Sequence, residues 1–188
     1  MSKINIQSDN QVAWDNQMAI VNKIVDSLNY PIDPGIKETV CALMMHDFPT
    51  IASCEGHLPN AGKDVHGLPY PWIDISTKEP EGFDDAKGIA LDKLREKWYL
   101  SNLSEQRRMM LLLKEFYKNR KIDYPIMLAF EPIGAWGSFR LRSSSGEQYQ
   151  IQTPEEVQEF YVKYRNEMAE FTEFLKKKIF LSEKDTNM

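Results

Sequence analysis

The fold of this chain is most readily inferred from residues 50–76, which read TIASCEGHLPNAGKDVHGLPYPWIDIS. Thr50–Cys54 has the composition of a short strand, and in Trp72–Ser76 Ile73 and Ile75 alternate with Trp72, Asp74 and Ser76, as in a strand with one buried face. The 17 residues between these strands contain several prolines and glycines, which favour a shaped loop over a helix. The stretch therefore predicts two strands joined by a long loop.

Amphipathic helices are predicted both before and after these strands in the sequence, because apolar residues recur there at alternating spacings of three and four. Pro34 is suited to the first position of a helix, with Asp33 as its N-cap, and Thr153–Glu156 forms a capping box before the last helix. The predicted helices cover residues 10–29, 34–48, 84–100, 104–120 and 154–181, of which the third and fourth could form one bent helix.

Three more strands are predicted in the second half of the chain, at residues 125–131, 138–142 and 148–152, the last two as a hairpin around Ser143–Gly146. The expected order is α-α-β-β-α-α-β-β-β-α. We therefore expect a single α+β domain over residues 1–181, with a mostly antiparallel sheet of about five strands and helices packed on one face. Residues 182–188 are expected to form a flexible tail.

Composition narrows the class of protein. Of the 188 residues 42% are hydrophobic and 27% charged, as in ordinary soluble proteins, and the net charge of −5 argues against a surface dedicated to nucleic acid. No apolar run approaches the roughly 20 residues that cross a membrane. The N-terminal residues lack the apolar segment of a secretory signal, so the expected location is the cytoplasm, with both cysteines reduced.

The five cysteines and histidines of the chain all fall between residues 41 and 66: Cys41, His46, Cys54, His57 and His66. These side chains supply the thiolates and imidazoles that bind metals or carry out nucleophilic chemistry. Their clustering predicts a site at the end of the Thr50–Cys54 strand.

One interpretation of the cluster is a metal centre. Cys54 and His57 have C-x-x-H spacing, and Gly56 between them can adopt a positive φ that turns both side chains toward one point. His66 would return from the loop as a third ligand, leaving one position open, as in catalytic zinc sites. A divalent metal such as zinc is the cofactor that this arrangement implies, with Glu55 as general base or as a hydrogen-bond partner of a ligand.

A second interpretation needs no metal. Cys54 would be a nucleophile, His57 or His66 its base, and Asp74 or Glu55 the carboxylate that orients the imidazole.

A third interpretation is purely structural. Buried free cysteine often behaves as a small hydrophobic residue, as expected for Cys41. Ser53, Glu55 and His57 would then supply only the hydrogen bonds that hold the loop against the sheet.

Two arginines form a second candidate feature. Arg140 and Arg142 are two residues apart in a predicted strand, so both guanidinium groups leave the same face and could clamp a phosphate or carboxylate. Asp74 and Glu131 also project from strands, so either could neutralise the arginines. If these side chains share a face, a charged pocket bordered by Trp72 and Trp136 is expected. The alternative is a solvated strand face.

The motif Ser53–His57 (S-C-E-G-H), followed by Pro71–Asp74 (P-W-I-D), resembles uncharacterised bacterial and phage proteins with an S-C-E-G-H motif before a P-W strand. That resemblance implies no activity.

A weaker similarity is to the tRNA wybutosine-synthesizing protein 3 family, methyltransferases with an α/β fold of their own. Its strand ends in S-C-S-G-R, and Phe130–Pro132 resembles a family strand that contains E-P. Glu55 and His57 depart from the motif, and no comparable basic surface for tRNA is evident. The resemblance implies a site at the end of the strand but not the substrate.

These observations give a leading functional hypothesis and two alternatives. The leading one is a pocket that binds or processes a small polar or anionic ligand, with Cys54, Glu55, His57 and Asp74 at the chemistry. Ser53, Trp72, Glu131, Arg140 and Arg142 would contact the ligand. The first alternative is a non-catalytic module that binds a partner protein, and the second is RNA modification.

Overall fold

The computed structural model describes residues 6–58 and 68–181. Within them the chain is a mixture of helices and one antiparallel sheet, which confirms the predicted α+β class. The elements in chain order are α1 (Ile6–Val21), η1 (Pro34–Ile36), α2 (Lys37–Met45), β1 (Thr50–Cys54), β2 (Trp72–Ile75), α3 (Ile89–Tyr117), β3 (Leu128–Ile133), β4 (Ser138–Ser143), η2 (Gly146–Ile151) and α4 (Pro154–Leu181).

The sheet has the order β1-β2-β4-β3, so β1 and β3 are its two edges. All three strand pairs are antiparallel, as expected from the sequence. Cys54 at the end of β1 lies opposite Trp72 of β2, and Asp74 of β2 lies opposite Arg140 of β4. Because directly opposed residues share a face, these four side chains lie on the same side of the sheet.

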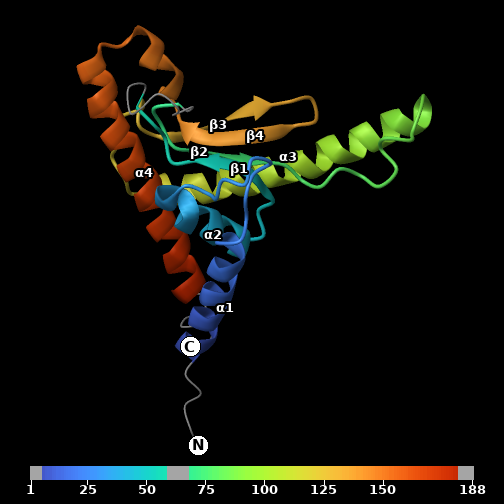
Figure 1. Ribbon diagram of the computed structural model, residues 1–188, viewed down its shortest axis with the longest axis horizontal. Coiled ribbons are helices and arrows are strands. Elements are labelled where there is room, and N and C mark those ends of the chain that lie inside the picture. Colours follow the sequence, from blue (N-terminus) through green and yellow to red (C-terminus); the bar gives the residue numbers. More distant parts are fainter. Residues whose placement is uncertain (1–5, 59–67, 182–188) are drawn as a thin grey trace, which may run out of the picture.

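The other face of the sheet packs against the helices. Ile73 and Ile75 of β2 and Phe139 and Leu141 of β4 are completely buried there. They join apolar side chains of all four α-helices in one core. Figure 1 shows α2 and α3 together on one side of the sheet, the arrangement that the alternation predicts.

The first helix ends at Val21, eight residues before the predicted end at residue 29. The chain turns instead, and a bridge joins Val25 to Pro31. The Asp26 carboxylate accepts hydrogen bonds from the backbone N–H groups of Leu28 and Tyr30. This local Asx turn competes with the helix, although the apolar spacing continues through the segment.

The N-cap predicted for Asp33 is also wrong. The helix opens with the short 3-10 turn η1, and the Asp33 side chain makes no capping hydrogen bond to it. The carboxylate turns toward the end of β1 instead, where it accepts the N–H of Glu55.

Residues 89–117 form a single helix, which confirms the one-helix alternative over two separate helices. The expected break at residues 102–104 is absent because Asn102 has buried partners. Its side-chain oxygen accepts the N–H of Thr77 at 2.7 Å, and its amide nitrogen donates to the carbonyl of Trp136 at 2.8 Å.

The predicted fifth strand is wrong, since residues 146–151 form η2. A strand there would have to pair with β4, but β2 and β3 already occupy both edges of β4. The hairpin lies earlier in the chain, between β3 and β4, where Gly134 and Gly137 have positive φ. Within the described ranges, none of the helices combines the length and apolarity that a membrane crossing requires.

Candidate metal centre

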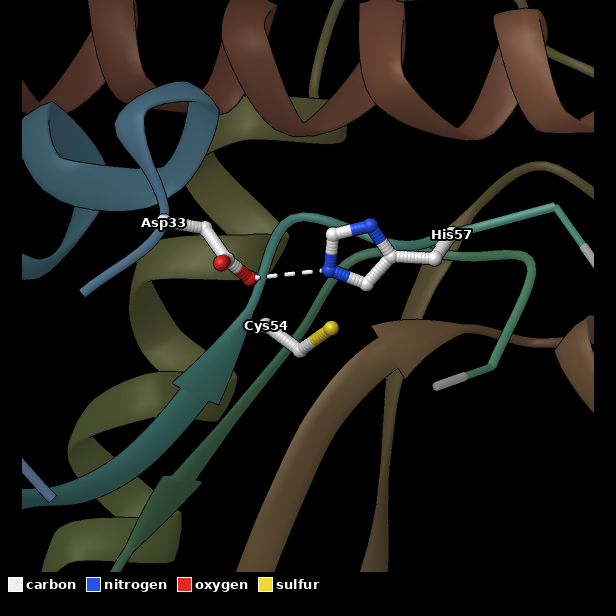
Figure 2. Close-up of side chains that lie close together, drawn as sticks. All are labelled: Asp33, Cys54 and His57. Atoms are coloured by element: carbon white, nitrogen blue, oxygen red, sulfur yellow. Dashed lines mark hydrogen bonds and ion pairs between the residues drawn. The ribbon is translucent and has the colours of Figure 1, made fainter. Parts of the chain in front are cut away.

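Asp33, Cys54 and His57 come together beside the end of β1. One carboxylate oxygen, the thiol sulfur and one ring nitrogen lie within 4.8 Å of one another. His57 Nε2 is 3.2 Å from Asp33 Oδ2, and Figure 2 shows the sulfur on the same side of the imidazole as Nε2. Cys54 is 7% exposed, and the other two residues are half-buried.

Gly56 gives the motif its shape. Its φ of +85° turns the chain directly after β1, as the C-x-x-H spacing predicts. The Gly56 N–H donates to Cys54 Sγ at 3.4 Å, and the next N–H, that of His57, donates to the Leu68 carbonyl at 2.8 Å. The turn thus places the thiol and the imidazole next to each other.

Asp33 is the member that sequence reasoning missed as a site residue. It lies 21 positions before Cys54, and its neighbour Pro34 makes it resemble a helix cap. Its Oδ2 accepts the Glu55 N–H at 3.1 Å, which fixes the carboxylate beside the strand end. No spacing pattern in the sequence connects it to Cys54 and His57.

Glu55 lies in the motif, but its carboxylate contacts other elements. Oε2 accepts the Gly35 N–H at 2.6 Å, and Oε1 is 3.6 Å from a guanidinium nitrogen of Arg165 on α4. These contacts support a positioning role, in which Glu55 ties the end of β1 to η1 and α4.

The surroundings of Cys54 keep its sulfur protonated. Burial raises the pKa of the thiol to about 11, and the negative charges of Asp33 and Glu55 act in the same direction. The N–H of Gly56 opposes this by donating to the sulfur. At neutral pH, and without a nearby cation, the group is therefore a neutral thiol and a poor nucleophile.

This shift makes stability depend on pH. The unfolded thiol ionises near 9.0 and the folded one near 11, so its contribution is complete below pH 9 and is lost between pH 9 and 11. Each pKa unit is worth about 1.4 kcal/mol, which gives about 2–3 kcal/mol in total. Urea denaturation with a chelator present should be compared at pH 8 and pH 10.5. Between these pH values, the free energy of unfolding should fall less for Cys54→Ala than for the unmodified protein. Equal losses would contradict the assigned environment.

The three donor atoms suit a tetrahedral divalent cation. Carboxylate, thiolate and imidazole are all common zinc ligands, and bonds of 2.0–2.3 Å place such ligand atoms about 3.3–3.8 Å apart. The 3.2 Å separation of Asp33 Oδ2 and His57 Nε2 already matches, and the sulfur lies within 4.8 Å of both atoms. Of the predicted metal ligands, Cys54 and His57 belong to this cluster, whereas His66 lies outside the described residues.

A hollow of about 420 Å³ opens beside the cluster, a volume typical of small-ligand sites. Ser53 and Trp72, two of the residues predicted to contact a ligand, are part of its lining. Its wall is mostly apolar, and the described lining contains no lysine or arginine. The full lining is Ile24, Val25, Asp26, Tyr30, Pro31, Ile32, Asp33, Val40, Thr50, Ile51, Ala52, Ser53, Cys54, His57 and Trp72.

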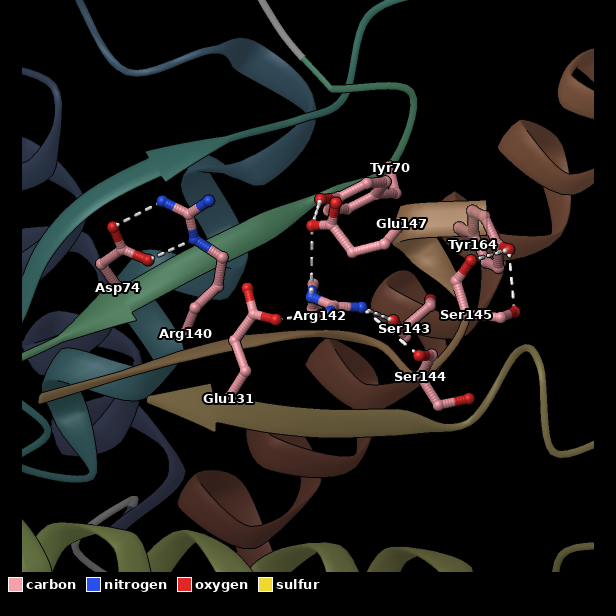
Figure 3. A network of polar contacts seen from close by, with 10 residues as sticks. All are labelled: Tyr70, Asp74, Glu131, Arg140, Arg142, Ser143, Ser144, Ser145, Glu147 and Tyr164. Atoms are coloured by element: carbon pink, nitrogen blue, oxygen red, sulfur yellow. Dashed lines mark hydrogen bonds and ion pairs between the residues drawn. The ribbon is translucent and has the colours of Figure 1, made fainter. Parts of the chain in front are cut away.

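The predicted arginine pair lies outside this lining, on the sheet face opposite the core (Figure 3). Arg140 donates to both oxygens of Asp74, at 2.6 and 2.8 Å, and lies 3.8 Å over the Trp72 ring. Arg142 pairs with Glu131, which lowers the pKa of that carboxyl. Asp74 and Glu131 therefore neutralise the arginines, as anticipated, and this pairing does not favour an anion clamp.

Comparison with protein-family models, curated proteins and solved structures found no significant match. The family resemblances of the motif thus remain expectations.

Proposed function

We propose that the protein binds a divalent cation such as zinc through Asp33, Cys54 and His57. The open coordination position would face the hollow, where the cation would hold or activate a small polar ligand. The observation that carries this proposal is the convergence of the three donor atoms within 4.8 Å at the wall of the hollow.

Charge balance supports a cation at this position. A thiolate and a carboxylate together carry two negative charges, which a divalent cation cancels. Binding would displace the proton that Cys54 holds, because the thiolate is the form that ligates metals. Three protein ligands leave a fourth position for water or substrate, whose carbonyl the metal can polarise.

The geometry favours a metal over a cysteine nucleophile. In a nucleophile–histidine–carboxylate relay, the nucleophile and the carboxylate contact different ring nitrogens. Here Asp33 contacts Nε2 of His57, and the sulfur lies on that same side of the ring (Figure 2). The absence of lysine and arginine from the described lining also argues against phosphate or RNA as the ligand of the hollow.

Zinc titration of the chelator-stripped protein tests the proposal. We expect one zinc ion per chain by calorimetry, and a loss of affinity on the order of a hundredfold in Asp33→Asn, Cys54→Ala and His57→Ala. Affinity should also fall as the pH is lowered, because protons compete for the same three groups.

Cys41→Ala and His46→Ala are the matched controls, since they remove a thiol and an imidazole that lie outside the cluster. They should bind zinc like the unmodified protein. Absence of stoichiometric zinc, or equal affinity in the cluster variants and the controls, would refute the proposal.

A further inference from the structure

We infer that the ligand of the hollow is a short extended peptide, which pairs with the free edge of β1 and places one backbone carbonyl at the cation. The role of the cation rests on the proposed function, whereas the pairing with β1 rests on the strand geometry alone.

The free edge follows from the register. The Ser76 N–H donates to the Pro49 carbonyl, so the backbone groups of Ser76, and of every second residue before it in β2, point toward β1. Trp72 is one of these residues, and Cys54 opposite it therefore directs its own N–H and C=O toward β2. Successive residues of a strand direct these groups to opposite sides, so those of Ser53 and Glu55 point away from β2. The Glu55 N–H does so, because it reaches Asp33. Ser53 lines the hollow, and its outward groups are available to a ligand strand.

Asp33 shows which kind of group can bind to this edge. Its Oδ2 takes the Glu55 N–H at 3.1 Å, as the carbonyl of an adjacent strand would. The equivalent donor two residues earlier is the N–H of Ser53, a residue that lines the hollow. In an antiparallel alignment the carbonyl of one peptide residue would accept this N–H, and the N–H of the same residue would donate to the Ser53 carbonyl. The preceding residue of the peptide would then lie close to Asp33, Cys54 and His57.

The wall opposite this edge selects an apolar side chain. Ile24 and Val25 line the hollow across from β1 and are 37% and 49% exposed, and Ile51 of β1 itself is 60% exposed. A thiolate and a carboxylate neutralise a divalent cation, and the described lining offers no basic side chain to an anion. Charge complementarity therefore favours a neutral peptide backbone with an apolar residue over a phosphate or a nucleic acid.

The size of the hollow limits the length of the peptide. At about 3.3 Å per residue, a three-residue segment spans about 10 Å. This is comparable with the free edge from residue 51 to Glu55, and about 420 Å³ accommodates a ligand of that class.

Fluorescence anisotropy with dye-labelled Ala-Val-Ala amide tests the inference on the zinc-loaded protein. A second peptide carries an N-methyl group on the valine, so its valine has no N–H to donate to the Ser53 carbonyl. Ser53→Pro removes the outward N–H of β1, which an edge strand tolerates, while Ser53→Ala keeps the N–H and loses only the hydroxyl. We expect about tenfold weaker binding for the N-methyl peptide and for Ser53→Pro, and little change for Ser53→Ala.

Equal binding of both peptides, or no binding at millimolar concentration, would overturn the inference even if zinc binds as proposed. Zinc titration of Ser53→Pro shows whether the cation site is intact in that variant, and the N-methyl peptide tests the same pairing without any mutation. Peptide binding with the N-methyl effect in a protein that takes up no zinc would support strand pairing and refute the cation site.

Discussion

Gly56→Ala should lower the free energy of unfolding by about 3 kcal/mol and weaken zinc binding in the protein that remains folded. A φ of +85° is strained for alanine, which costs about 1–2 kcal/mol. The added Cβ would also lie 2.7 Å from the carbonyl carbon of Tyr70 and 3.0 Å from the nitrogen of Pro71. Both are backbone atoms of a buried segment, so neither can move aside without displacing the chain.

Gly82→Ala is the matched control for this substitution. Gly82 has a similar φ of +78°, but an added Cβ would meet no atom within 4 Å. This variant should show the backbone strain alone, about 1 kcal/mol, and unchanged zinc affinity. Urea denaturation and zinc titration of both variants separate the two contributions. Equal destabilisation would mean that the contact with Tyr70 has no effect.

Gly56 is an example of what the sequence could predict. The position of this glycine between Cys54 and His57 indicated that it would turn the chain, and its positive φ confirms this. The alternation of Ile73 and Ile75 likewise identified the buried face of β2 correctly. Both inferences concern neighbouring residues, whose relative placement the backbone geometry largely determines.

The third member of the cluster could not be predicted in that way. Asp33 reaches Cys54 because the chain turns back between Val25 and Pro31 and then passes the end of β1. That path depends on tertiary packing, whereas the local sequence equally suits a helix cap. In the same way, alternation placed Arg140 and Arg142 on one face of their strand, but only the strand order made Asp74 the direct partner of Arg140.

Arg120→Ala should have the other large effect, about 3–5 kcal/mol of destabilisation, because it leaves a buried carboxylate without its cation. Glu167 on α4 is only 3% exposed, and its Oε2 accepts a hydrogen bond from Arg120 at 2.6 Å. The other oxygen accepts the Tyr117 hydroxyl at 2.8 Å, and that hydroxyl accepts the N–H of Leu128 at 2.7 Å. One carboxylate thus connects the end of α3, the start of β3 and α4.

A double-mutant cycle distinguishes an unpaired charge from simple loss of packing, which is a real alternative because Arg120 also lies over the Phe116 ring. Glu167→Gln removes the charge but keeps an acceptor for Tyr117, so the double variant should regain much of the stability lost in Arg120→Ala. Glu170 is exposed and 3.4 Å from Arg120, and Glu170→Gln should change stability by less than about 1 kcal/mol. Additive effects in the cycle would instead assign the loss to packing. Because β3 and β1 are opposite edges of the sheet, folded Arg120→Ala protein should still bind zinc with unchanged affinity, which separates this stabilising network from the metal centre.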